Sequence, residues 1–589
     1  MSFQFTPVRR AHVISPFGPG ALQITQNGVC AVTCGPPTWL MSLTKGEMIA
    51  EVEVQDSHLE AHLGVHRLVA PWPLSDHPVP PTDWFVPAAR FPLFEYCINY
   101  RCNRLHIRNP GDGSQGRCNY CMNGAAKKRQ WPTTQVPIVL ACNAGHLADI
   151  PWIEWVHRGN GDGEGSCGRS DLRYRPGGIP DQPKVECRGC GSSRIFDRDE
   201  QFPCSGHRPW LPGLPAEPCP LHAIVVERSS ATLYFPEVAS SLAIPPQGID
   251  NPGLARKLRT DPILRSNREL FREDPSSAAV LRQMEQRCAV LSIETDAHQI
   301  ENHMRALEAN ELQGIDREKE LRAMLSRRSR PPKGDPPDLI VEPVPMVLYD
   351  SAAPLISALA AVSLVPRLRE VRVLNGFSRN SPPDHPPGYE QLWGQPCPED
   401  PPPDRRHGWL PAYEVYGEGI LFSLRMHVVS AWLGSSTVDE LRPRLRSRSR
   451  PEIVLAHSLA HAVMRAAAPY AGYPLPSLRE RLYTEVDDCL AFLIYTSEGD
   501  IRGTLGGLVE LGRPKRLESL LREASSSMKW CTTDPICIED GVELGLSGTT
   551  SRGACHHCLM VPETSCERGN RDLDRAFVIG RNGHSFGNI

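Results

Sequence analysis

The sequence lacks the features that mark a membrane or exported protein. No run of 18 apolar residues occurs in its 589 residues, and the opening stretch, MSFQFTPVRRAHV, has neither the apolar core nor the cleavage site of a signal peptide. We therefore expect a cytoplasmic protein with no membrane span.

A large excess of charge of either sign is also missing. The net charge is −4, and 22% of the residues are charged, which excludes a global electrostatic field for nucleic acid. One local exception is a run of five arginines within nine residues. It is either a loop that contacts DNA phosphates or a solvated linker, and its members are Arg442, Arg444, Arg446, Arg448 and Arg450.

Motifs of ATP-driven or hydrolytic enzymes are absent. SPFGPGAL, at 15–22, lacks the GK[ST] that gives a P-loop its phosphate lysine, so it predicts a tight turn. No DExH box, nucleophile elbow or nuclease-type carboxylate cluster is found. The sequence does not support ATP-driven translocation or catalysis by this chain.

One amphipathic helix is predicted at 453–468, with His457 and His461 on one face. A HExxH metalloprotease would need glutamate after the first histidine, and Ser458 stands there. The histidines are interpreted as structural, or as a functional polar cluster with Arg481 and Glu485.

Cysteine is plentiful, and in a reducing cytoplasm the 20 cysteines predict zinc sites in preference to disulfides. The C-terminal region, 530–575, offers five candidates for the four places of a structural zinc site, and a CxxC pair supplies two of them. The five are Cys531, Cys537, Cys555, Cys558 and Cys566.

A second cysteine-rich region covers 90–222. Its first group has zinc-ribbon spacing and consists of Cys97, Cys102, Cys118 and Cys121. A second ribbon is predicted from Cys187, Cys190, Cys204 and either Cys219 or His207, while Cys142, His146, Cys167 and His222 are further candidates. Cys30 and Cys34 are interpreted as core residues.

The composition predicts an α+β multidomain protein of three or four domains, with zinc-ribbon-like modules and a helical arm. The 57 prolines and 47 glycines indicate much irregular structure. Short strands are expected at 8–86, and the tryptophans of 145–157 are assigned to a core. A helical hairpin at 276–328, broken near Gly314, could also clamp another subunit.

The C-terminal half shows more elements. Within 341–377 we expect an Ala/Leu-rich helix and then the strand EVRVL. GWLPAYEVYGEGILFSL predicts paired strands, and AFLIYTSEGDIRGTLGGLVEL predicts a buried strand followed by a Gly-rich turn. Proline-rich 327–337 and 381–406 are interpreted as a linker and a surface loop.

Four stretches resemble the DrmB family, the helicase-associated subunits of the bacterial anti-phage system DISARM. They are VRRAHVISPFGPGAL at 8–22, LREVRVLNGFSR at 368–379, LAHSLAHAVMRAAAPYAGYPLPSLRERLY at 455–483, and ACHHCLMVPETSCERGNRDLDRA near the C-terminus. A related cysteine-rich ending closes the Mrf-type helicases.

The resemblance implies a non-catalytic Zn²⁺-binding subunit that forms a heterodimer with a DrmA-type helicase and engages foreign DNA. The resemblance and the composition together predict four domains, at 1–89, 90–230, 231–335 and 336–589. The last is predicted to be a Mrf-helicase-associated-type domain. We expect two or three structural zinc ions. Two alternatives stay open: a metal-dependent nuclease using His457 and His461, and an interaction scaffold without DNA contact.

Overall fold

The computed structural model describes most of the chain. The described residues are 4–5, 10–25, 27–39, 53–70, 87–122, 131–158, 171–177, 182–244, 254, 257–258, 261–275, 277–311, 316–327, 337–380, 390–391, 407–445, 449–486, 488–496, 506–539, 542–544, 549–580 and 585–587. Cys167, Gly314, Arg446, Arg448 and most of the two proline-rich stretches lie outside them.

The chain divides into two compact units, each assembled from separate segments. The first unit contains 1–54, 63–239 and 372–413, and the second contains 55–62, 240–371 and 414–589. Both mix sheets and helices, so the predicted α+β multidomain class is confirmed. The predicted boundaries near 89, 230 and 335 stay predictions.

The first unit begins with a sheet of short strands, as Gly and Pro punctuation predicts. Its order is β1-β6-β3-β2. The elements are β1 (Gln4–Phe5), α1 (Arg10–Ile14), β2 (Leu22–Ile24), β3 (Cys30–Thr33), α2 (Pro36–Trp39), β4 (Glu53–Val54), β5 (Val65–Val69) and β6 (Pro87–Arg90). Residues 15–20 form turns, and Cys30 and Cys34 are buried, as predicted.

Three small sheets carry the cysteine-rich region. Their orders are β8-β7-β9, β11-β10-β16-β15 and β12-β13-β14. The strands are β7 (Phe94–Cys97), β8 (Leu105–Ile107), β9 (Thr133–Gln135), β10 (Ile138–Cys142), β11 (Leu147–Ala148), β12 (Leu172–Arg175), β13 (Lys184–Cys187), β14 (Ser193–Ile195), β15 (Phe202–Pro203) and β16 (His222–Glu227).

Helix α5 (Trp152–His157) supplies an aromatic core for these sheets. Trp152 and Trp155 are buried, and Trp152 packs edge-on against Tyr174 with ring centres 5.5 Å apart. Both indoles also contact Phe196. The prediction that these tryptophans form a core is confirmed.

A buried arginine joins three segments of the first unit. Arg379, which follows β19 (Leu359–Ser378), donates to the carbonyls of Gly20 at 2.8 Å and Gly145 at 2.7 Å, and also to that of Leu233. Gly20 has a φ of +88°, and a Cβ there would lie 2.5 Å from the Phe377 ring. Two of the family-like stretches therefore meet through one guanidinium.

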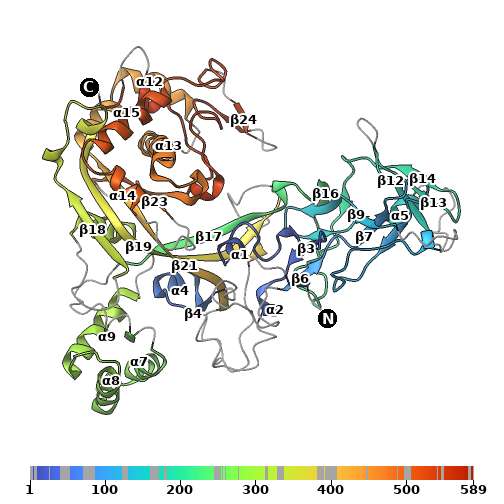
Figure 1. The fold of residues 1–589 in the computed structure, drawn as a ribbon, viewed down its shortest axis with the longest axis horizontal. Helices are drawn as coiled ribbons and strands as arrows, with labels where there is room; N and C mark the ends of the chain where they lie inside the picture. Colours follow the sequence, from blue (N-terminus) through green and yellow to red (C-terminus); the bar gives the residue numbers. More distant parts are fainter. Residues whose placement is uncertain are drawn as a thin grey trace. The chain divides into compact units, whose positions relative to one another are not determined.

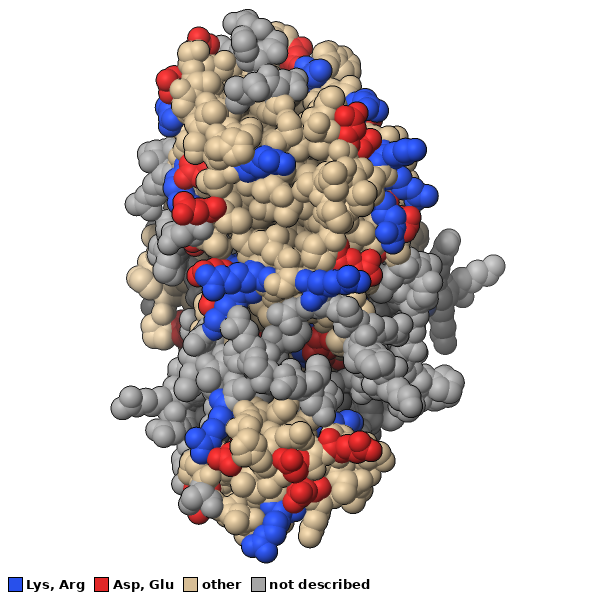
Figure 2. All heavy atoms as spheres, turned by 90° about the vertical axis from the view of Figure 1, so that its left-hand side faces the viewer, with Lys and Arg blue, Asp and Glu red and all other residues tan. Residues whose placement is uncertain are grey.

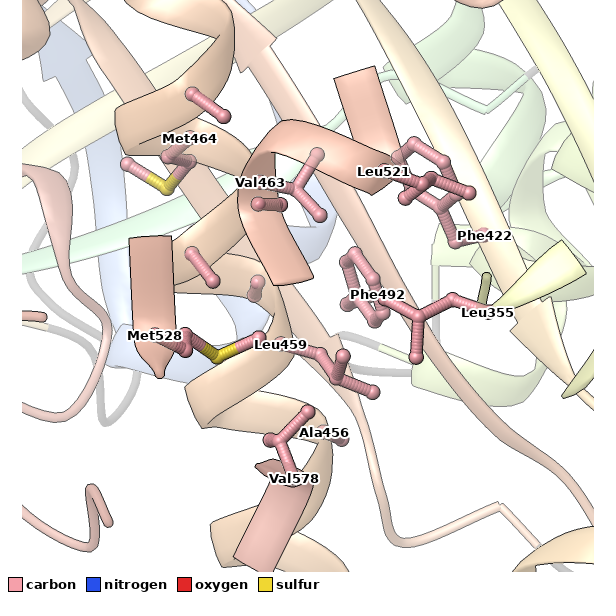
Figure 3. Packing of buried hydrophobic residues seen from close by; sticks show 14 of the residues in the cluster. Leu355, Phe422, Ala456, Leu459, Val463, Met464, Phe492, Leu521, Met528 and Val578 are labelled. Carbon is pink, nitrogen blue, oxygen red and sulfur yellow. The ribbon is translucent and has the colours of Figure 1, made fainter. Parts of the chain in front are cut away.

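The second unit is built around helix α13 (Pro451–Ala471), as Figure 1 shows. One side of α13 packs on β22 (Leu478–Tyr483) and β23 (Leu490–Thr496). Other sides contact α14 (Gly507–Leu511), α15 (Arg516–Met528) and α16 (Ala576–Ile579). Fourteen of its residues are buried because apolar partners surround it. Figure 3 shows Leu459 and Val463 among Phe422, Phe492 and Leu521.

The remaining elements of the second unit cover its sheet and ends. Its strands are β18 (Leu339–Val344), β22, β23 and parts of β19 and of β21 (His407–Leu424). Strand β17 (Phe235–Leu242) adjoins β19. Strand β20 (Glu390–Gln391) pairs with the part of β19 that belongs to the first unit. The helices and short strands are α4 (Ser57–Leu63), α11 (Met426–Leu433), α12 (Ser436–Leu441), β24 (Val542–Leu544) and β25 (Thr549–Ser551).

Two predicted elements are wrong. The Ala/Leu-rich stretch before EVRVL does not form an α-helix but leads into β19, most of whose residues are buried, because tertiary packing in a sheet overrides helix propensity. GWLPAYEVYGEGILFSL is one continuous strand, β21, and its glycines lie close against β23: a Cβ at Gly417 would lie 2.1 Å from the Thr496 carbonyl oxygen.

The predicted helical hairpin is instead three helices. They are α8 (Ala278–Val290), α9 (Ala297–Glu311) and α10 (Arg317–Leu325), preceded by α7 (Pro262–Glu273), which the sequence did not predict. Helices α7 to α9 share a small core, while Leu321 and Met324 of α10 join the core beneath β18 and β22. Within the described part of the chain, no helix combines the length and apolarity needed to span a bilayer.

Candidate metal centres

The described residues contain five groups of Cys, His or Glu side chains whose ligand atoms lie within 4.8 Å of one another. Four of the groups have four members and one has three. They are Cys97, Cys102, Cys118 and Cys121; Cys142, His146, Cys204 and Cys219; His157, Cys187 and Cys190; Cys531, Cys537, Cys555 and Cys558; and His457, His461, Glu480 and Cys566.

The first group, called the β7–β8 ribbon here, consists of the four cysteines predicted together. Cys97 ends β7, and Cys102 lies in the turn before β8. Cys118 precedes the short helix η3 (Tyr120–Met122), and Cys121 lies within it. The Cys97 and Cys121 sulfurs are 3.7 Å apart, and those of Cys102 and Cys118 are 3.8 Å apart. Four thiolates on a tetrahedral zinc lie about 3.8 Å from one another, so this geometry fits zinc.

The second group joins two hairpin ends. Cys142 and His146 flank the β10–β11 turn, and Cys204 and Cys219 lie between β15 and β16. Nδ1 of His146 lies 3.4 Å from the Cys142 sulfur and 3.5 Å from that of Cys204. The other ring nitrogen, Nε2, lies 2.7 Å from Glu217, which favours the tautomer whose Nδ1 lone pair faces the thiols.

The third group is smaller and more open. Cys187 ends β13, Cys190 lies exposed in the turn before β14, and His157 ends α5. Nδ1 of His157 lies 2.6 Å from the carbonyl oxygen of Ile153, so this N–H donates to the helix and leaves Nε2 for the thiols. Burial opposes protonation of this imidazole, but the Ile153 carbonyl and the two thiols raise its pKa.

The fourth group closes the C-terminal region. Cys531 and Cys537 follow α15, and Cys555 and Cys558 form the CxxC turn. The sulfur separations are 3.5 Å for Cys531 and Cys555, 3.8 Å for Cys537 and Cys558, and 3.7 Å for Cys555 and Cys558.

Backbone and charge prepare this group for a cation. The Cys537 thiol, the Cys555 N–H and the Arg575 guanidinium lower the pKa of Cys558 to about 5, against the opposing effect of burial. Arg575 itself is buried, pairs with Asp534 and donates to the Met528 carbonyl at 2.8 Å. All four cysteines are buried, which fits a structural site with no open position for water.

The fifth group lies between α13, β22 and the C-terminal region. Nε2 of His457 is 2.9 Å from Oε1 of Glu480 and 3.1 Å from the Cys566 sulfur, and Nε2 of His461 is 3.4 Å from the same carboxylate oxygen. Burial and the Glu480 carboxylate raise the pKa of the Cys566 thiol. Burial likewise lowers the pKa of His461.

Parts of these groupings were not predicted from the sequence. Cys187 and Cys190 were predicted to join Cys204 and either Cys219 or His207, whereas the structure separates Cys187 and Cys190 from Cys204 and Cys219 because β13 and β15 belong to different sheets. His157 was not considered. In the sequence, the only indication of a role for His157 was its position at the end of the apolar helix, ten residues after Leu147.

The histidine pair was also assigned the wrong neighbours. Arg481 points away from the pair, because alternate residues of a strand face opposite sides, and forms a bidentate pair with Glu320 of α10. Glu485 is exposed. Glu480 and Cys566 take their places beside the histidines.

The arginine run is not uniformly exposed. Arg444 is buried and pairs with Asp574 at 3.1 Å, and it donates to the Ile538 carbonyl at 2.7 Å. Arg442 and Arg450 are exposed, although they contact Asp439 and the Thr484 carbonyl. Arg444 is therefore a structural residue of the second unit.

Two comparisons with known proteins bear on the chain. Residues 9–235 match a family model described as a domain of unknown function, DUF8724. The chain is 26% identical over 536 residues to the DISARM protein DrmB of Bacillus paralicheniformis, an alignment that covers 84% of this chain and 89% of that protein.

The alignment covers most of this chain and most of that protein. Together with a four-cysteine group in the C-terminal region, it supports the predicted relationship. In its sequence the chain is a DrmB-like protein.

Proposed function

We propose that this chain is a non-catalytic zinc-binding subunit of a helicase complex that engages foreign DNA in anti-phage defence. The role in defence is supported by similarity to a DISARM protein along 84% of the chain. The partner would be a DrmA-type helicase, which supplies the ATPase that this sequence lacks. The site of action would be the cytoplasm, where thiols stay reduced.

Zinc would stabilise parts of the chain that have small cores. The sheets of the cysteine-rich region have strands of two to six residues, too short to be stable alone. Binding of Zn²⁺ to four thiolate or imidazole ligands contributes folding free energy directly, so each ribbon becomes a rigid support for its surface side chains.

The surface of the β7–β8 ribbon is the observation that carries DNA engagement. Tyr100 and Tyr120 are 76% and 51% exposed, unusual values for large aromatic side chains. Arg101 donates to the Tyr100 hydroxyl at 2.9 Å, and the Arg104 guanidinium lies 3.7 Å from the centre of the Tyr120 ring. Aromatic rings beside arginines can stack on bases and attract phosphates, as in proteins that bind single strands.

The face drawn in Figure 2 carries mixed charge. Lys and Arg side chains cross the middle of this face beside Asp and Glu side chains, and both signs of charge also lie at its margins. The chain has a net charge of −4, which agrees with this mixed surface. A local contact through the ribbon therefore explains DNA engagement better than a global field.

The test is DNA binding by the full chain. Fluorescence anisotropy measures its affinity for a labelled single-stranded oligonucleotide and for the corresponding duplex. Tyr100→Ala combined with Tyr120→Ala should weaken binding at least about tenfold, because stacking of one base contributes about 1–3 kcal/mol. Tyr470→Ala is the matched control, since Tyr470 is a 66% exposed tyrosine on α13. It should leave the affinity unchanged.

Salt dependence then separates phosphate contacts from stacking. Each lost phosphate contact should reduce the log-log salt slope by about one, so Arg101→Ala should flatten it. The same measurement on Arg442→Ala with Arg450→Ala tests the exposed arginines of the run. Equal DNA affinity of the tyrosine variant and the wild type would exclude the ribbon surface, and no binding by any form would favour the interaction scaffold.

The burial of the histidine pair argues against the nuclease alternative. His457 and His461 are both 0% exposed, and a nuclease metal must contact a phosphodiester directly. A chain that degrades plasmid DNA with Mg²⁺ or Mn²⁺ after stringent purification would reverse this conclusion.

A further inference from the structure

The buried group beneath α13 has the form of a second metal site in the C-terminal part of the chain. We propose that His457, His461, Glu480 and Cys566 bind a structural Zn²⁺ ion, separate from the ion proposed for the four C-terminal cysteines. The inference does not depend on the helicase or on DNA, because it concerns only the stability of the second unit.

Local structure explains why the four side chains converge. His457 and His461 are one helical turn apart on α13, and their rings lie 4.5 Å apart in an edge-on arrangement. Glu480 points toward α13 from β22, while its neighbour Arg481 points to the other side. Cys566 directly follows the short helix η10 (Glu563–Ser565), which contacts β22.

The Glu480 carboxylate and the two imidazoles lie closer together than groups that do not interact with one another. Both oxygens of Glu480 and Nε2 of His461 are buried without a hydrogen-bond partner among the described atoms. Yet Oε1 lies 2.9 Å from His457 and 3.4 Å from His461. The ligand atoms of all four side chains lie within 4.8 Å of one another, as the ligands of one cation do.

Other buried carboxylates of the protein are satisfied. Glu418 accepts hydrogen bonds from Tyr473 at 2.7 Å and from the N–H groups of Leu508 and Val509. Glu320 is held by both guanidinium nitrogens of Arg481. Glu480 is the exception among the described residues, because its Oε1 faces only ring nitrogens of His457 and His461, which balance the carboxylate only when they are protonated. A buried charge without such a partner costs several kcal/mol. A divalent cation would remove that cost.

The surrounding backbone orients two of the ligands. Nδ1–H of His461 donates to the Leu559 carbonyl at 3.0 Å, which leaves the Nε2 lone pair facing Glu480. The Cys566 sulfur accepts N–H groups from Asn570 at 3.1 Å and Arg568 at 3.4 Å, as a metal-bound thiolate does. Metal sites characteristically hold their ligands through such contacts.

The ligand set selects the class of ion and its role. Two imidazoles, one carboxylate and one thiolate form a mixed nitrogen, oxygen and sulfur set of the kind that zinc binds in a tetrahedron. Four protein ligands leave no place for water or substrate, and each is at most 8% exposed. The ion would therefore join α13, β22 and the C-terminal region.

The test is the metal content of the purified full chain, measured by inductively coupled plasma mass spectrometry. Cys566→Ala, His461→Ala and Glu480→Gln should each lose one zinc equivalent per chain relative to the wild type. Cys288→Ala is the matched control, because Cys288 is a fully buried cysteine of the same unit that belongs to none of the five groups. It should keep the full content.

A variant that keeps a ligand in place guards against loss of metal through misfolding. His461→Cys should retain the zinc equivalent, and after Co²⁺ substitution it should increase the thiolate-to-cobalt charge-transfer absorption near the ultraviolet. His461→Ala should not. Folded Glu480→Gln or His461→Ala protein with the full zinc content of the wild type would overturn the proposal, as would His461→Cys without the added absorption.

Discussion

His146 shows how a single carboxylate can prepare a metal ligand. Its Nε2 lies 2.7 Å from Glu217, and its Nδ1 faces the sulfurs of Cys142 and Cys204. Glu217 is also paired with Arg208 at 2.9 Å, so its carboxylate is held in position. The imidazole is therefore fixed in the tautomer that a metal requires.

Replacing Glu217 should weaken zinc at this group without removing a ligand. Glu217→Gln should lower the zinc affinity about 10- to 100-fold, the usual effect of losing such a partner. Competition with a chromogenic chelator on the full chain measures this effect. Glu227→Gln is the control, because Glu227 is an exposed glutamate of the same unit that forms a surface pair with Arg198. Equal zinc release by the two variants would contradict the role of Glu217.

The spacing of ligands within one turn could be predicted, but their partners from other turns could not. The CxxC pairs of Cys118 with Cys121 and Cys555 with Cys558 each supply two ligand atoms to one group, as expected. Cys187 was joined to the wrong partners because sequence does not give the order of strands in a sheet, and the sequence left open which of the five C-terminal cysteines stands apart, which the structure shows to be Cys566. Glu217 and Glu480 had no local signal at all.

At the scale of elements, helices α7 to α9 form a small core of their own. Its members include Leu264 and Phe271 of α7, Met284 and Cys288 of α8 and Ile300 of α9, and all of its buried residues come from 254–304. Asp261 caps α7 and pairs with Arg287 of α8 at 2.7 Å, which fixes the two helices together. Figure 1 shows α7, α8 and α9 as one cluster.

A cavity in this core should therefore unfold the cluster alone. Phe271→Ala should cost about 3–5 kcal/mol, as truncation of a buried phenylalanine does. Hydrogen exchange should then lose protection in α7, α8 and α9 while α13 keeps its protection, because the two cores share no residue. Leu270→Ala is the control one residue away, at a side chain that is 48% exposed. Loss of protection in α13 would show that the cores are coupled.

The periodicity of apolar residues predicted helices where packing agreed with it. α13 and β23 lie where the sequence predicts a helix and a buried strand, but α13 is buried on more sides than the predicted amphipathic helix would be. β19 could not be predicted from its Ala and Leu content, since only its neighbours in the sheet decide its conformation. Helix α7 has a regular apolar stripe, which the prolines around it concealed.

For the whole molecule, stability and partnership are separate questions. Every described cysteine is free of disulfides: 14 of the 18 belong to the five candidate metal groups, and Cys30, Cys34 and Cys288 are buried outside these groups. In the absence of disulfides, metal binding would be the main cross-link that stabilises the fold of the first unit. The sequence contains no GK[ST] phosphate-binding loop.

The last prediction is that the chain functions only with a helicase. Alone it should neither hydrolyse ATP nor unwind DNA, and with a DrmA-type helicase it should form a stable complex. ATPase assays, strand-displacement assays and size-exclusion chromatography of the mixture measure these properties. We expect an interface above about 2,000 Å², the range of permanent assemblies.

We propose two surfaces as candidate contacts for that interface, and variants can separate them. The α7 to α9 cluster carries exposed apolar side chains at Ile263, Leu270 and Val290, whereas the second candidate is the segment after β18, where Val347 is 87% exposed. One variant combines Leu270→Asp with Val290→Asp, and the other carries Val347→Asp alone. The variant whose charge lies on the surface that the helicase covers should co-elute less with the helicase. Failure of the wild-type proteins to co-elute at micromolar concentration would refute the partnership, and ATP turnover by the isolated chain would refute its dependence on a helicase.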